Sequence, residues 1–125
     1  MSKDSFLKIS RTRQNHSIKG QVRAVDFEQD GHYIIYIPSL GLSAYGDDVV
    51  QARKMMSEFV IPDFCETLLQ QSLSKIINEL KNLGWAPSPF FKSELSTAAH
   101  IDKEGILKDF DLPRNTVMHE SLLAV

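Results

Sequence analysis

The sequence predicts an α+β fold with a three- or four-stranded, mostly antiparallel sheet covered by helices, in the order strand–strand–strand–helix–helix–strand. Two observations predict it. Closely spaced turn residues divide the stretch from Val22 to Gly46 into short runs of β-branched and aromatic residues. Beyond residue 46, apolar residues instead recur every three or four positions, as on one face of a helix.

The chain begins with a basic segment whose structure the pattern leaves open. Up to Val25 there are six basic residues and one acidic residue, whereas Asp26 to Leu80 holds nine acids and three bases. Residues 1–16 fit either a flexible basic arm or a strand at the edge of the sheet. A basic arm is also able to grip phosphates.

The three strands of the meander are expected at Ile18–Phe27, His32–Ile37 and Leu42–Tyr45. Asp30-Gly31 fits a tight turn with positive φ between the first two. In the second strand, HYIIYI, apolar side chains occupy both faces, which indicates a strand that is covered on both sides or central in the sheet. Pro38 ends this strand because proline lacks an amide hydrogen.

Two helices follow the meander. Asp47 and Asp48 stand where a helix N-cap is needed. We expect Pro62 to kink or interrupt the first helix, and Phe64–Gln70 to continue helically. Ser72 is the expected cap of the second helix, which Gly84 ends. Their apolar stripes comprise Val49, Ala52, Met56, Phe59 and Val60 in the first, and Leu73, Ile76, Ile77, Leu80 and Leu83 in the second.

The pattern weakens after the second helix. Trp85 is expected to clamp the helix end to the core, and FFKSEL (90–95) is the candidate fourth strand. The domain organisation predicted is one α+β domain over 1–95. Residues 96–125 form a C-terminal tail whose order depends on a partner or a second copy of the chain. Open sheet edges also favour homo-oligomers.

The residue inventory favours a protein without a catalytic, cofactor or metal site. His16, His32, His100 and His119 have no ligand spacing between them, and Cys65 is the only cysteine, flanked by Asp63 and Glu66. No glycine-rich phosphate motif or nucleophile motif is present. A lone cysteine, no signal peptide and no long apolar run favour a cytoplasmic protein.

One enzymatic alternative rests on carboxylates. Asp26 on a strand and Glu58 on the first helix have the placement of acids in two-metal nucleases of the ribonuclease H type. Turn and cap roles account for Asp30, Asp47 and Asp48, and no third acid completes the cluster. The expectation is therefore a protein that is not an enzyme.

The stretch from about residue 20 to 86 resembles the N-terminal domain of HicB-family antitoxins. The resemblance is carried by Asp30-Gly31, Tyr33 to Ile37, Pro38 to Leu42, Gly46-Asp47 followed by Ala52, and Leu83-Gly84-Trp85. It implies a partial ribonuclease H-like scaffold without the nuclease's acidic cluster.

As to function, the resemblance implies an antitoxin that masks HicA, a small basic mRNA-cleaving toxin. Family members usually also carry a C-terminal DNA-binding segment, and residues 86–125 show no such pattern, which weighs against operator binding. The acidic body complements a basic partner. Tyr45, Asp47 and Asp48, at the strand-to-helix corner, are the predicted partner-binding residues. The alternative is a stand-alone protein that binds a small ligand or another protein.

Overall fold

The computed structural model describes residues 5–97 and 103–125 and has an α+β fold built on a seven-stranded sheet. Among the described residues the paired strands all run antiparallel. The strands are β1 (Ser5–Arg11), β2 (His16–Gln29), β3 (His32–Ile37), β4 (Leu42–Gly46), β5 (Ala86–Pro87), β6 (Glu94–Thr97) and β7 (His119–Ala124). The α+β class is confirmed, but the sheet is larger than the three or four strands expected.

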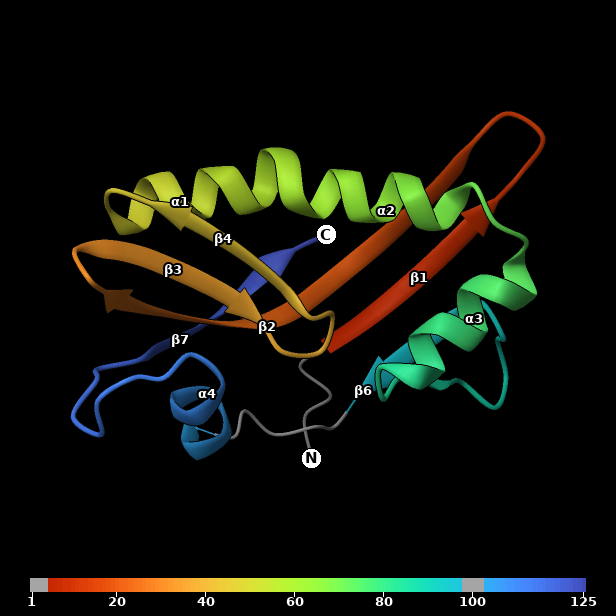
Figure 1. The fold of residues 1–125 in the computed structure, drawn as a ribbon. Helices are drawn as coiled ribbons and strands as arrows, with labels where there is room; N and C mark the ends of the chain where they lie inside the picture. Colours follow the sequence, from red (N-terminus) through yellow and green to blue (C-terminus); the bar gives the residue numbers. More distant parts are fainter. Residues whose placement is uncertain (1–4, 98–102) are drawn as a thin grey trace.

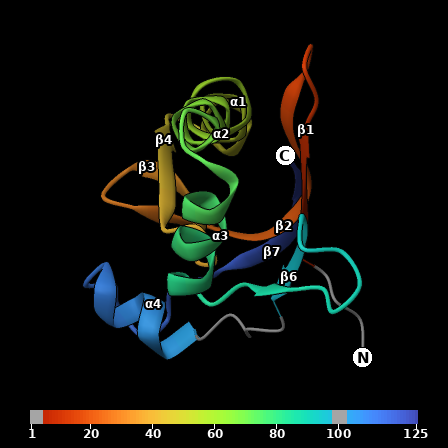
Figure 2. The ribbon, with the colours of Figure 1, turned by 90° about the vertical axis from the view of Figure 1, so that its right-hand side faces the viewer.

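The long strand β2 organises the sheet. Its first half pairs with β1, its second half with β3, and residues 21–26 pair with β7. Gln21 pairs with both Phe6 and Ala124, and Val25 pairs with both Tyr36 and Glu120. A strand residue has one partner on each side. β7 therefore pairs with one edge of β2, and β1 and β3 pair with the other edge. Figure 2 shows the sheet curling around the helical segment formed by residues 49–69.

The helical layer consists of α1 (Val49–Met55), the π-helical turn η1 (Met56–Val60), α2 (Ile61–Leu69) and α3 (Leu73–Asn82). In Figure 1 the first three form one continuous helix across the sheet. The expected caps are present: Asp48 Oδ1 accepts from the Gln51 amide at 2.7 Å, and Ser72 Oγ accepts from Lys75 at 3.4 Å. A fourth helix, α4 (Lys103–Asp109), covers the opposite face of β2 and β3 (Figure 2).

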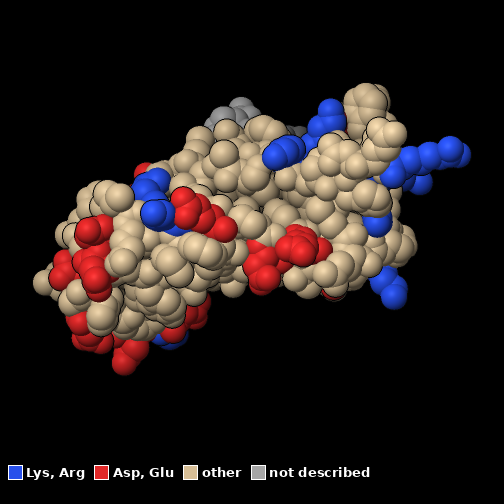
Figure 3. Space-filling view, turned by 90° about the horizontal axis from the view of Figure 1, so that it is seen from above, with Lys and Arg blue, Asp and Glu red and all other residues tan. Residues whose placement is uncertain are grey.

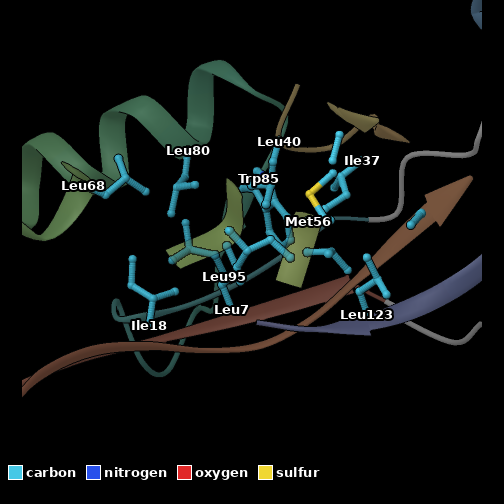
Figure 4. Packing of buried hydrophobic residues seen from close by; sticks show 14 of the residues in the cluster. Leu7, Ile18, Ile37, Leu40, Met56, Leu68, Leu80, Trp85, Leu95 and Leu123 are labelled. Carbon is cyan, nitrogen blue, oxygen red and sulfur yellow. The ribbon is translucent and has the colours of Figure 1, made fainter. Parts of the chain in front are cut away.

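The core has two parts because β3 is covered on both faces, as HYIIYI predicted. Ile35 and Ile37 pack beneath the long helix, whereas Ile34 packs with Val25, Phe27 and Ile106 under α4. Trp85, 2% exposed, clamps α3 to this main core, and its indole N–H donates to the Ser39 carbonyl at 2.9 Å. Figure 4 shows Trp85, Met56, Leu80 and Leu7 converging there.

Both ends of the described chain lie within the fold. β1 pairs with β2 on one side and β6 on the other, so it is an interior strand and not an edge strand. The Arg11 guanidinium donates to the carbonyls of Gln71 (2.6 Å) and Leu69 (3.3 Å) at the end of α2. From the expected tail, β7 joins β2, so residues 119–124 are ordered by pairing within one copy. The candidate strand 90–95 is shifted to Glu94–Thr97.

The helix does not break at Pro62, which was expected to kink or interrupt it. The Ile61 amide donates to the Met56 carbonyl, five residues back, so η1 inserts one extra residue just before the proline. A wide turn lets the proline ring pass the preceding carbonyls without a break. The buried face then continues at Ile61 and Leu68, one position later than an unbroken α-helix would place it.

This register shift changes the role of Phe59. The expected stripe counted Phe59 as a core residue, but its side chain is 57% exposed, whereas Met56 is fully buried. We expect Phe59→Ala to change the free energy of unfolding by less than about 0.5 kcal/mol. Met56→Ala should lower it by about 3 kcal/mol through cavity formation. Urea unfolding measures both, and a larger loss for Phe59→Ala would contradict the π-helical register.

Candidate functional site

The predicted partner-binding residues lie where β4 meets α1. Tyr45 is 60% exposed, although its neighbour Ala44 is buried, because alternate residues of β4 face opposite sides of the sheet. Asp47 and Asp48 are both exposed. Asp48 is occupied as the N-cap, and the Asp47 amide donates to the Gln51 side chain, so the Asp47 carboxylate and the Tyr45 ring are presented to solvent.

A second exposed surface lies on the helix itself. Met55 (40% exposed) and Phe59 (57% exposed) are four residues apart and therefore neighbours on the helix surface. Exposed acids accompany them: Glu58 beside Phe59, Asp63 one turn further, and Glu66 beyond. We call the set of Met55, Glu58, Phe59, Asp63 and Glu66 the outer helix surface.

The charge of this surface differs from that of the opposite end of the molecule. Residues 47–66 hold five acids and two bases, whereas residues 5–25 hold five bases and no acid. Figure 3 shows acidic atoms over one end and along the middle of the helical face, with basic atoms gathered at the far end, where β1 and β2 meet. The molecule is therefore electrostatically polarised along the helix axis.

Asp26, the first acid of the nuclease alternative, is buried and ion-paired. Its side chain lies 3.5 Å from Arg53 Nη2 and 3.5 Å from His119 Nδ1. Arg53 also donates to Ser121 Oγ at 2.7 Å, which links α1 to β7. Glu58, the second acid, is exposed on the outer helix surface. The structure thus does not join these two acids in one site.

The described residues hold no group of three or more His, Cys, Asp or Glu side chains placed to bind a metal ion. His16, His32 and His119 lie apart on β2, the start of β3 and β7, and His100 lies outside the described residues. Within the described ranges, no helix is both long and apolar enough to cross a membrane.

Cys65 is half-buried on α2, in the wall of a groove between α2 and β2. Burial raises the pKa of its thiol above the ordinary value, and the nearby charge of Lys19 lowers it by less. A raised pKa leaves less thiolate at neutral pH, which is the reverse of what an activated nucleophile requires.

Sequence reasoning missed two features of this region. The sequence does not mark Met55 and Phe59 as surface residues. Phe59 is exposed by the π turn, and the only sequence signal for that turn is Pro62, which follows the point where the apolar residues stop recurring every three or four positions. Arg53 lies outside the apolar stripe expected for the first helix, and its pairing with Asp26 depends on a strand 27 residues earlier in the chain.

A comparison of the chain with protein-family models, curated proteins and solved structures gives no match.

Proposed function

We propose that this chain is a non-enzymatic binding module that covers the active surface of a small basic protein. The observation that carries the proposal is the outer helix surface, where Met55 and Phe59 are exposed on the same helix as the exposed acids Glu58 and Asp63. An apolar centre with a charged rim is the usual anatomy of a protein-binding patch. Asp47 lies at the start of the same helix, whereas Tyr45 pairs with Ile34 and faces the other side of the sheet.

The resemblance to HicB antitoxins supports the choice of partner, a HicA-like RNA-cleaving toxin. An RNA-cleaving protein presents basic side chains to phosphates, and the acidic rim complements these charges. We further propose that the β2–β4 meander and the helix after it correspond to the partial ribonuclease H-like scaffold of that family. The chain would act in the cytoplasm, with a homo-oligomer formed through open sheet edges.

Binding to a short basic protein encoded by a neighbouring gene tests the proposal, and the absence of such a gene counts against it. In Phe59→Ser with Glu58→Lys, we expect affinity to fall about 100-fold, because an aromatic anchor and a complementary charge are lost together. Titration calorimetry of the purified pair measures this loss. The matched control is Glu79→Lys, which reverses an exposed charge on α3, away from the patch, and should leave affinity unchanged.

Two results would refute the masking role. One is the absence of binding between the two wild-type proteins. The other is an equal loss of affinity in the Glu79→Lys control, which would mean that affinity depends on the net charge of the chain and not on this surface. If the chain instead binds a different protein through Phe59, the stand-alone alternative is the correct one.

A further inference from the structure

The groove in which Cys65 lies has an open strand edge as one of its walls. It has a volume of about 590 Å³ and separates α2 from the first half of β2. Its apolar lining comes from Ile61 and Leu69 on the helix side and Ile18 on the strand side. Figures 1 and 2 place the C-terminal end of β7 between these two walls.

The strand edge is open because β7 covers only part of β2. The last backbone bond on that side runs from the Val125 amide to the Gly20 carbonyl, at 3.0 Å. β1 occupies the other side of His16–Lys19. On the groove side, these four residues pair with no strand in the ranges 5–97 and 103–125.

An open edge beside an apolar groove fits one mode of recognition. A strand extends about 3.3 Å per residue, so the segment His16–Lys19 spans about 13 Å. An added strand forms backbone hydrogen bonds with such an edge, and every second side chain enters the groove. The exposed edge is also the kind that natural proteins normally cover.

Charge defines the remaining side chains of the occupant. The register places Lys8 directly opposite Lys19, and both are exposed. Like charges across a strand pair are unfavourable, and an acidic neighbour relieves that repulsion. Glu94 already lies 3.8 Å from Lys8, whereas Lys19 stands at the groove rim. Glu66 on the opposite rim excludes acids from the α2 side.

We propose that this groove binds an extended segment of another protein, with alternating apolar and acidic side chains, as an added strand along His16–Lys19 in line with β7. Apolar residues point toward Ile61 and Leu69, and acidic residues lie on the outer side beside Lys19. The groove shares only its rim residue Glu66 with the outer helix surface, and neither Met55 nor Phe59 lines it, so its test is independent of the function proposed above.

The test uses the full chain and a hexapeptide of sequence VEVEVT that carries fluorescein on its N-terminal amine and an amide at its C-terminus. We expect anisotropy to report saturable binding, about tenfold weaker for the same residues in the order VVVEET, because only an alternating strand separates its two kinds of side chain. Bound VEVEVT should also slow alkylation of Cys65 by N-ethylmaleimide. Absence of saturable binding, or equal binding of both peptides, would overturn the proposal.

Two variants and one control locate the site. Ser57→Phe places a large side chain in the groove and should abolish binding, whereas Ser74→Phe puts the same side chain on exposed α3 and should have no effect. Lys19→Glu should weaken VEVEVT and favour VKVKVT, because it reverses the charge at the rim. Equal binding by the Ser57→Phe and Ser74→Phe chains would place the peptide elsewhere.

Discussion

Gly20→Ala is expected to lower the free energy of unfolding by about 3 kcal/mol, since it combines backbone strain with a steric clash. Gly20 has φ +155°, and a Cβ atom there would overlap the backbone carbonyl of Phe6 on the neighbouring strand. Relief requires β1 to move away from β2, and β1 also carries β6. Urea unfolding followed by circular dichroism measures the loss.

Gly41→Ala is the matched control. Gly41 also has a positive φ (+65°), but a Cβ atom there meets nothing within 4 Å. Its expected loss is therefore the conformational term alone, about 1–2 kcal/mol. If the two variants lose the same free energy of unfolding, the result would contradict the close contact between β1 and Gly20.

Asp26→Asn is expected to lower the free energy of unfolding by about 2–3 kcal/mol, because it leaves the Arg53 guanidinium without its buried counterion. The side chain of Asp26 is 5% exposed, whereas that of Arg53 is 36% exposed. Because part of the arginine reaches solvent, the expected loss of stability is at the lower end of the range for buried ion pairs. The double variant Asp26→Asn with Arg53→Gln should recover part of the loss, as a double-mutant cycle will show.

A surface ion pair on the same strand provides the comparison. Glu120 on β7 lies 3.3 Å from Arg23, with side chains 51% and 33% exposed, and Glu120→Gln should cost less than about 1 kcal/mol. The nuclease alternative expects a different outcome for Asp26→Asn: unchanged stability and loss of metal-dependent RNA cleavage. That combination of results would revive it.

The local elements were readable from the sequence because each depends on neighbouring residues. Asp30 and Gly31 have φ of 52° and 82°, as a two-residue hairpin turn requires, and glycine and aspartate are residues that tolerate such angles. The apolar residues on both faces of HYIIYI indicated that both faces of this strand are buried. They did not indicate that α4 packs on the second face. The cap at Asp48 likewise follows from its own side chain.

Of the exposed residues discussed above, the sequence indicates Tyr45 but not Phe59. Tyr45 is exposed by the alternation of β4, which the sequence shows directly. Phe59 is exposed by the extra residue of η1, and a helical wheel drawn at 3.6 residues per turn assigns it to the core. Pro62 could either break the helix or widen one of its turns. The outcome depends on packing against the sheet, over which α1 and α2 lie in one line.

The sequence by itself determined the meander, its turns, the helix caps and the polarised charge, since these follow from backbone preferences and short-range periodicity. The tertiary structure alone decided the placement of β1 inside the sheet, the return of β7 to β2, the counterion of Asp26 and the outward turn of Phe59. Each of these joins residues far apart in the chain, or depends on which face a helix buries. Local preference does not encode such pairings, because they are selected by the packing of the whole core.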